Sequence, residues 1–195
     1  MDPVCVIMGE NQGGIFMSTA KVKRPPLEKL RLITVTGLFS ALIFVFTAYL
    51  HIPTGAGYTH AGDGLIYLAA CILPAPYAVA SGVIGGALAD GLSGYPVWIP
   101  ATILIKALTA LLFSRKTERI LCLRNILAII PALVLCIVGY SVYEGVFLTK
   151  GLSKAALIAA FTQTPAYCVQ VAASAALFIA LAVALDRTDL RKRLL

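Results

Sequence analysis

Residues 64–89 read GLIYLAACILPAPYAVASGVIGGALA, an uncharged stretch between Asp63 and Asp90 that contains Pro-Ala-Pro at 74–76. Proline has no backbone N–H donor and clashes with the preceding helical turn, so it kinks or interrupts a helix. The stretch is therefore either one kinked membrane span or two short spans joined by a turn. The choice decides how many times the chain crosses a bilayer.

The placement of the basic residues distinguishes the two readings, because Lys and Arg concentrate in cytoplasmic loops. If 64–89 were a single span, the basic cluster at 115–124 would fall outside the cell. Two short spans place that cluster on the same side as the basic residues before the first apolar stretch and at the C-terminus. We therefore predict two spans that turn at 74–76. The three clusters are Lys21, Lys23, Arg24, Lys29 and Arg31, then Arg115, Lys116, Arg119 and Arg124, then Arg187, Arg191, Lys192 and Arg193.

Four other apolar stretches are long enough to cross a hydrocarbon core of about 30 Å at about 1.5 Å per residue. They are residues 32–50, 97–114, 125–148 and 155–185, the last of which is longer than one straight span needs and is expected to kink at Pro165. The predicted fold is an all-α integral membrane bundle of six transmembrane helices, multi-pass in the cell membrane, with cytoplasmic N and C termini.

The chain is predicted to divide into a cytoplasmic, disordered extension (1–30), a membrane domain (31–186) and a basic cytoplasmic tail (187–195). Met17 is an alternative start, which would leave residues 1–16 as an artefactual extension.

Composition agrees with a membrane protein. Hydrophobic residues make up 59% of the 195 residues and charged residues 13%, whereas soluble domains carry about 25% charged residues. The net charge of +7 lies mainly in the predicted cytoplasmic clusters. It orients the chain and contacts anionic lipid, so no nucleic-acid partner is expected.

Several catalytic and cofactor motifs are absent from the sequence. It has no G-x-x-x-x-G-K-[ST] phosphate loop, so the chain should not hydrolyse ATP. Its five cysteines include no C-x-x-C pair, and His51 and His60 have the spacing of ordinary loop histidines. No nucleophile and base are spaced to react together. We expect no enzyme activity, no metal and no cofactor.

Polar and aromatic residues recur at helical spacing on three consecutive predicted helices, where polar side chains in a bilayer are costly and usually functional. Lys106 lies eight residues below Trp98, about 12 Å at helical rise, and the other stripes also fall in the outer half. The pattern predicts a pocket open to the outside. The stripes are Trp98, Thr102, Lys106 and Thr109; Tyr140, Tyr143 and Glu144; and Gln163, Tyr167 and Gln170.

Structural interpretations of the same residues remain open. Lys106 either binds ligand or forms an ion pair with Glu144 or Asp90 that only ties helices together. Asp63 precedes an apolar run, where aspartate commonly caps a helix. Tyr58 and Trp98 also fit an ordinary aromatic belt at the outer interface.

Small residues four apart allow close helix packing in lipid. The stripes Ala78, Gly82 and Gly86, and Ala172, Ala176, Ala180 and Ala184, suit packing inside the bundle. Gly37 and Ala41 on the first helix either pack in the same way or dock another membrane protein.

The block Gly57–Phe113 contains G-Y-x-H-x-G-D, a glycine-rich helix ending in Ala-Asp, then G-Y and P-x-T-x-x-x-K. It resembles the substrate-binding (S) component of bacterial energy-coupling factor (ECF) vitamin transporters, in the riboflavin-transporter-like branch. The resemblance implies high-affinity capture of a vitamin outside the cell. It also implies transport through a separate transmembrane coupling subunit and two cytoplasmic ATPases.

The resemblance assigns contact with the coupling subunit to Gly37 and Ala41, with Gly in place of the usual first Ala. The family builds its pocket from the loops after helices 1 and 3 and from helices 4–6. The matching substrate-binding candidates are Tyr58, His60, Tyr95, Trp98, Lys106, Glu144, Gln163 and Gln170.

The predicted function is that of a substrate-binding subunit. The alternative is a self-sufficient proton-coupled secondary transporter in which Asp90, Lys106 and Glu144 relay protons, although no inverted repeat is visible. Aromatic rings around a few charges suit a flat heterocycle. Riboflavin, pyridoxine-type compounds, pyrimidine precursors and queuosine-type bases all fit.

Overall fold

The computed structural model describes the backbone of residues 4–11, 14–21, 26–54, 57–117, 119–148 and 154–188. The chain forms two compact units, Met1–Arg31 and Leu32–Leu195. Most of the predicted basic tail 187–195 lies outside the described residues, and the predicted division at 31 and 187 stays a prediction.

The N-terminal unit contains an antiparallel hairpin of β1 (Val4–Asn11) and β2 (Gly14–Lys21), with Val4 opposite Lys21 and Asn11 opposite Gly14. The sequence predicted a disordered extension over residues 1–30, and this hairpin lies within that segment. Its two strands are rich in β-branched and aromatic residues such as Val6, Ile7 and Phe16, which favour extended backbone.

The second unit begins at Leu32, within helix α1 (Leu27–Ala48). A short antiparallel hairpin follows, formed by β3 (His51–Thr54) and β4 (Gly57–His60), with His51 opposite His60. The sequence predicted a plain loop at this place. The other elements of this unit are helices, which is consistent with the predicted all-α membrane protein. The pairing gives the segment after α1 a fixed register.

The stretch 64–89 forms two helices, α2 (Asp63–Ile72) and α3 (Ala75–Leu92). Leu73 is extended, with φ −82° and ψ 154°, and Pro74 follows with φ −56° and ψ 146°. The predicted interruption of 64–89 is therefore confirmed, with the turn at Leu73 and Pro74.

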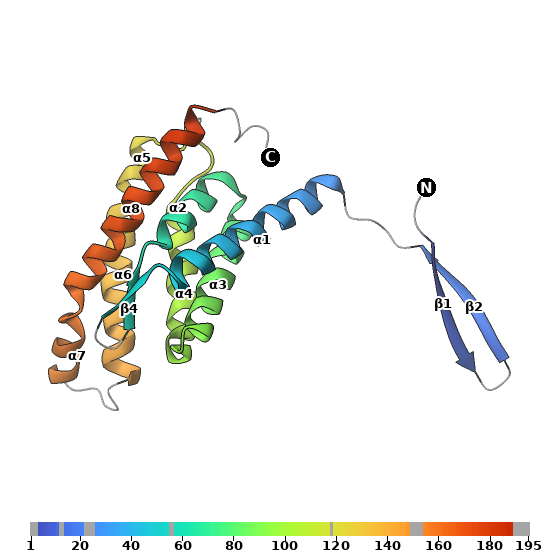
Figure 1. The fold of residues 1–195 in the computed structure, drawn as a ribbon, viewed down its shortest axis with the longest axis horizontal. Helices are drawn as coiled ribbons and strands as arrows, with labels where there is room; N and C mark the ends of the chain where they lie inside the picture. Colours follow the sequence, from blue (N-terminus) through green and yellow to red (C-terminus); the bar gives the residue numbers. More distant parts are fainter. Residues whose placement is uncertain are drawn as a thin grey trace. The chain divides into compact units, whose positions relative to one another are not determined.

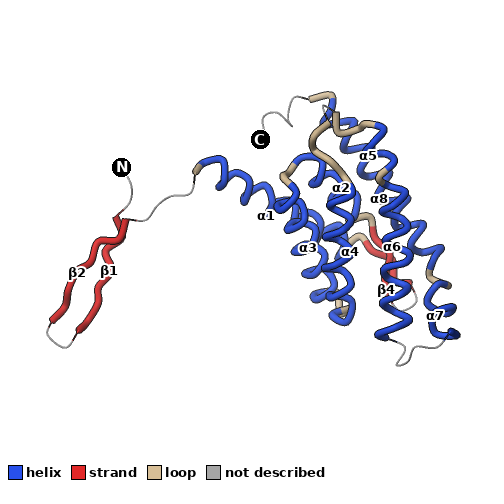
Figure 2. The backbone as a smooth tube through the Cα atoms, turned by 180° about the vertical axis from the view of Figure 1, so that it is seen from behind, coloured by secondary structure: helices blue, strands red, loops and turns tan. Residues whose placement is uncertain are grey.

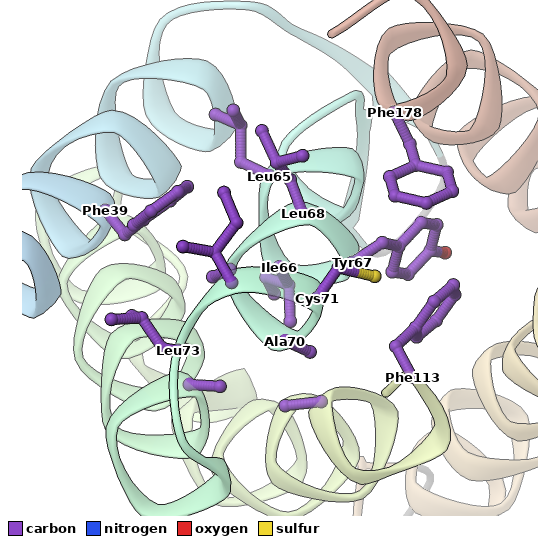
Figure 3. Packing of buried hydrophobic residues seen from close by; sticks show 14 of the residues in the cluster. Phe39, Leu65, Ile66, Tyr67, Leu68, Ala70, Cys71, Leu73, Phe113 and Phe178 are labelled. Atoms are coloured by element: carbon purple, nitrogen blue, oxygen red, sulfur yellow. The ribbon is translucent and has the colours of Figure 1, made fainter. Parts of the chain in front are cut away.

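Helix α2 lies in the centre of the core, and all of its residues are buried. A helix that is apolar on every side needs protein or lipid around it. Tyr67 stacks on Phe113 with ring centroids 4.4 Å apart and meets Phe178 of a later helix edge-on at 6.0 Å (Figure 3). At Gly64 a Cβ atom would overlap the Ser174 carbonyl oxygen, so glycine permits this close approach.

The remaining helices complete the bundle. They are η1 (Pro96–Trp98), α4 (Ile99–Leu112), α5 (Leu123–Leu127), α6 (Ile129–Tyr143), the π-helical turn η2 (Glu144–Leu148), α7 (Lys154–Phe161) and α8 (Thr164–Asp186). Figures 1 and 2 show α8 beside α6, and α3 packs against α4. The predicted kink near Pro165 is a break between α7 and α8, with Pro165 in the first turn of α8.

Among the described residues, three helical stretches are long and apolar enough to cross a membrane: Leu27–Ala48, Leu123–Leu148 and Ile158–Asp186. Shorter apolar helices cover Asp63–Ile72 and Pro96–Leu112. Large apolar side chains point outward on several helices, including Leu38 (58% exposed), Leu104 (62%) and Val169 (59%). Exposed apolar side chains on so many helices suit a lipid environment, and the chain is a mostly helical, multi-pass membrane protein.

Candidate functional site

A cavity of about 450 Å³, measured with its open mouth, lies among the β3–β4 hairpin, the end of α3, the start of α4, the α6–η2 region and α8. Six of the eight residues predicted from the sequence line it: Tyr58, His60, Trp98, Glu144, Gln163 and Gln170.

Lys106, the seventh predicted residue, does not line the cavity and forms a buried ion pair. Its Nζ donates to Asp63 Oδ1 at 2.6 Å, and the side chains are 2% and 5% exposed. Gln170 Nε2 donates to the other carboxylate oxygen, Asp63 Oδ2, at 3.0 Å. The sequence suggested Glu144 or Asp90 as the partner of Lys106, and both suggestions are wrong.

Asp63 also differs from its expected role. The residue that precedes α2 is Gly62, and no side-chain hydrogen bond caps the helix. The Asp63 carboxylate instead faces Lys106 of α4 and Gln170 of α8. The short contact favours both charges, because each compensates the desolvation of the other.

Aromatic rings form much of the cavity wall. Trp98 meets Tyr140 edge-on at 5.8 Å, and Tyr140 stacks with Tyr167 at the same centroid distance. Tyr95, the eighth predicted residue, packs against Tyr58 at 4.9 Å but does not line the cavity. These rings give the cavity flat apolar faces of the kind that stack on planar ligands.

His60 is buried and neutral. Its Nδ1 accepts a hydrogen bond from the Gly62 N–H at 3.1 Å, so the ring proton resides on Nε2. Burial, helped by the nearby Lys106 charge, lowers the pKa of His60 to about 3, although Asp63 acts in the opposite direction. Gly62 is needed beside this ring, because a Cβ atom there would overlap Thr47 Oγ1.

Tyr58 ties the hairpin to α3. Its hydroxyl donates to Asp90 Oδ1 at 2.5 Å, and burial and the Asp90 charge raise the pKa of Tyr58. The hydroxyl thus stays protonated as a donor. Thr59 of the same strand donates to the Ala166 carbonyl at 3.3 Å, so the hairpin is held on both α3 and α8.

Two carboxylate oxygens of the cavity wall lack a hydrogen-bond partner among the described residues: Asp90 Oδ2 and Glu144 Oε2. Buried polar atoms in native proteins are almost always hydrogen-bonded to protein, water or ligand. These two acceptors therefore mark where a bound molecule or water completes the site.

Six lining residues were not among the predicted site residues: Thr54, Gly57, Asp90, Thr102, Tyr140 and Tyr167. Three of them, Thr102, Tyr140 and Tyr167, lie on the polar stripes that the helical spacing identified. No periodicity marks Asp90, which reaches the cavity because α3 ends there. Within the described ranges, no group of three or more His, Cys, Asp or Glu side chains is placed to hold a metal ion.

The predicted docking pair lies away from this cavity. Gly37 and Ala41 are exposed on α1, and a Cβ atom added at Gly37 would meet nothing within 4 Å. Their contact with a partner stays a prediction.

A sequence comparison with curated proteins finds no match. A family model described as "ECF-type riboflavin transporter, S component" matches residues 28–187, which include every residue of the cavity wall. This family consists of transporter components rather than enzymes. The chain belongs to the family of ECF-type riboflavin transporter S components.

Proposed function

We propose that this chain is the membrane-embedded substrate-binding subunit of an ECF transporter. It captures a vitamin or a related small heterocyclic compound from outside the cell, and partner subunits drive uptake with ATP. The observation that supports this most directly is the cavity, which combines flat aromatic faces with unpartnered polar atoms. The sequence has no phosphate loop of its own.

In the proposed topology the chain crosses the bacterial cell membrane six times, with both termini in the cytoplasm. The spans are α1, α2, α3, η1 with α4, α5 to η2, and α7 with α8. The turn at Pro74 and the basic clusters of the sequence support this arrangement. The mouth of the cavity, beside the β3–β4 hairpin, then faces outside.

The wall residues have distinct proposed roles. Trp98, Tyr140 and Tyr167 stack on the ring system of the substrate, while His60, Glu144, Gln163 and Gln170 form hydrogen bonds with its edge. Tyr95 supports Tyr58. Lys106 acts indirectly, because it holds Asp63 and, through Asp63, Gln170.

The proposed partners are a transmembrane coupling subunit and two cytoplasmic ATPases. We place the coupling subunit on α1, where Gly37 and Ala41 leave open space for a close helix contact. Membrane lipid covers the remaining apolar surface.

Reconstituted vesicles test this proposal. The chain alone should bind its substrate but accumulate none, with or without ATP, and mass spectrometry of the purified chain should reveal the retained compound. Uptake driven by a proton gradient in vesicles that contain only this chain would contradict the proposal and support a secondary transporter. The bond between Lys106 and Asp63 argues against that alternative, because Lys106 is already engaged.

A further inference from the structure

The acidic groups of the cavity wall are two carboxylates without a matching cation. Asp90 and Glu144 line the cavity, and within the described residues no Lys or Arg does. Lys106 is buried nearby, but its charge is already balanced by Asp63 at 2.6 Å. The wall therefore presents an excess of negative charge to whatever occupies it.

Each of these carboxylates has an oxygen that no described residue satisfies. Asp90 is 5% exposed, and its Oδ2 is buried without a partner. Glu144 Oε2 is likewise buried without a partner. A buried acceptor without a donor is destabilising, and for a charged group the penalty is larger. A ligand that brings donors to these atoms removes the penalty.

The surroundings of Asp90 also favour a positive charge. The residue lies in the last turn of α3, which ends at Leu92, and the carbonyls of a helix C-terminus attract cations. The Tyr58 hydroxyl occupies Asp90 Oδ1, so Oδ2 remains for the ligand. Trp98, which lines the cavity, offers an indole ring, and such rings attract cations as well as flat rings.

We infer that the substrate is a flat heterocycle that carries a protonated amine, and that this ammonium group binds at Asp90 and Glu144. The inference rests on the proposed function and narrows it to a substrate class. Anionic compounds, such as phosphorylated or carboxylated heterocycles, are disfavoured, because two carboxylates without a cation repel them.

Matched ligand pairs test the inference in the unaltered chain. Pyridoxamine and pyridoxine differ only in an aminomethyl against a hydroxymethyl group. The same exchange relates 5-aminomethyl- and 5-hydroxymethyl-4-amino-2-methylpyrimidine. Riboflavin is the neutral reference, and pyridoxal phosphate is the anionic one.

Trp98 is the single tryptophan of the chain and lines the cavity, so quenching of its fluorescence in detergent or nanodiscs reports binding directly.

We expect the aminomethyl member to bind at least tenfold more tightly than its hydroxymethyl counterpart in at least one pair. Asp90→Asn and Glu144→Gln should each reduce that preference to less than threefold, because the amide that replaces each carboxylate no longer favours an ammonium group. Glu28→Gln removes an equal charge from an exposed site on α1 and should leave the preference intact. If one variant fails to fold, the ligand pairs in the wild-type chain still decide.

Equal or tighter binding of the hydroxymethyl members would overturn the inference. Binding of riboflavin without binding of any amine would also overturn it, while the proposed substrate-binding function would stand. Failure of every compound, charged and neutral, to bind up to millimolar concentration would contradict both.

Discussion

Lys106 Nζ lies 2.6 Å from Asp63 Oδ1, which connects the middle of α4 to the first residue of α2. The two residues are 43 positions apart in the chain, and both side chains are almost completely buried. Because α2 is surrounded by the other helices, this ion pair fixes its N-terminal end in the core. Each buried charge is also stabilised only while its partner is present.

Removal of Lys106 alone should destabilise the fold. Lys106→Met leaves the Asp63 carboxylate buried without its cation, a change that typically costs about 3–5 kcal/mol. The double variant Lys106→Met with Asp63→Asn should recover most of this loss, because the amide oxygen can still accept from Gln170. Thermal unfolding in detergent measures both. Recovery by Glu144→Gln instead of Asp63→Asn would show that the wrong carboxylate had been assigned to Lys106.

Gly64→Ala should destabilise the bundle where α2 meets α8. The added Cβ would overlap the Ser174 backbone oxygen, so the helices must move apart, with an expected loss of about 1–3 kcal/mol. Gly37→Ala is the matched control, because its Cβ would meet nothing within 4 Å. That variant should be neutral or slightly stabilising in the isolated chain, since alanine favours helix by about 1 kcal/mol over glycine. Equal unfolding temperatures for the two variants would contradict the close approach.

Bulky residues on α1 should separate binding from assembly. Gly37→Leu with Ala41→Leu is expected to leave the Kd of the substrate unchanged and to prevent co-purification with the coupling subunit, because the helices could no longer approach closely. Leu38→Ala alters the same helix at an exposed position and serves as the control. Normal assembly of the double variant would remove Gly37 and Ala41 from the interface.

Acid should destabilise the chain through His60. Its folded-state pKa of about 3 lies below the ordinary value of 6.5, so protons bind the unfolded chain more tightly. The stability that the neutral ring contributes is complete above pH 6.5 and is lost progressively as the pH falls from about 6.5 towards 3. At about pH 5.5 this loss amounts to about 1.4 kcal/mol. His60→Gln should reduce the fall in unfolding free energy between about pH 7.5 and 5.5 by this amount. An unchanged pH dependence would mean that the pKa of His60 is the same in the folded and the unfolded chain.

Labelling of single cysteines tests the proposed topology. In a cysteine-free background, Ser93→Cys at the end of α3 should react with an impermeant maleimide in intact cells. Lys116→Cys, after α4, should react only once the cells are permeabilised. External reaction at position 116 would refute the arrangement of six spans.

Helical periodicity alone predicts much of the cavity wall. The spacing of residues along a helix fixes the direction of their side chains. Trp98 and Thr102 therefore share one face of their predicted helix, and Gln163 and Gln170 share one face of another. The partner of Lys106 is not predictable in this way. It depends on which helix occupies the centre, and α2 takes that place through contacts between distant segments, such as the stack of Tyr67 on Phe113.

The β3–β4 hairpin escapes prediction for a related reason. Its strands are four residues each and show no clear alternation of polar and apolar residues. The bonds from Tyr58 to α3 and from Thr59 to α8 hold it in place. Asp90 joins the site only because this hairpin folds over the end of α3.

The bond between Gln170 and Asp63 has a consequence for molecular recognition. A side-chain amide can normally turn either its oxygen or its nitrogen toward a partner. Here the carboxylate of Asp63 accepts hydrogen bonds only, so it selects the nitrogen, and the same nitrogen also contacts Cys136 Sγ at 3.7 Å. The side-chain carbonyl oxygen of Gln170 therefore remains as a hydrogen-bond acceptor for a bound ligand. Asp63 and Lys106 thus set the polarity of this position in the cavity although neither side chain lines it.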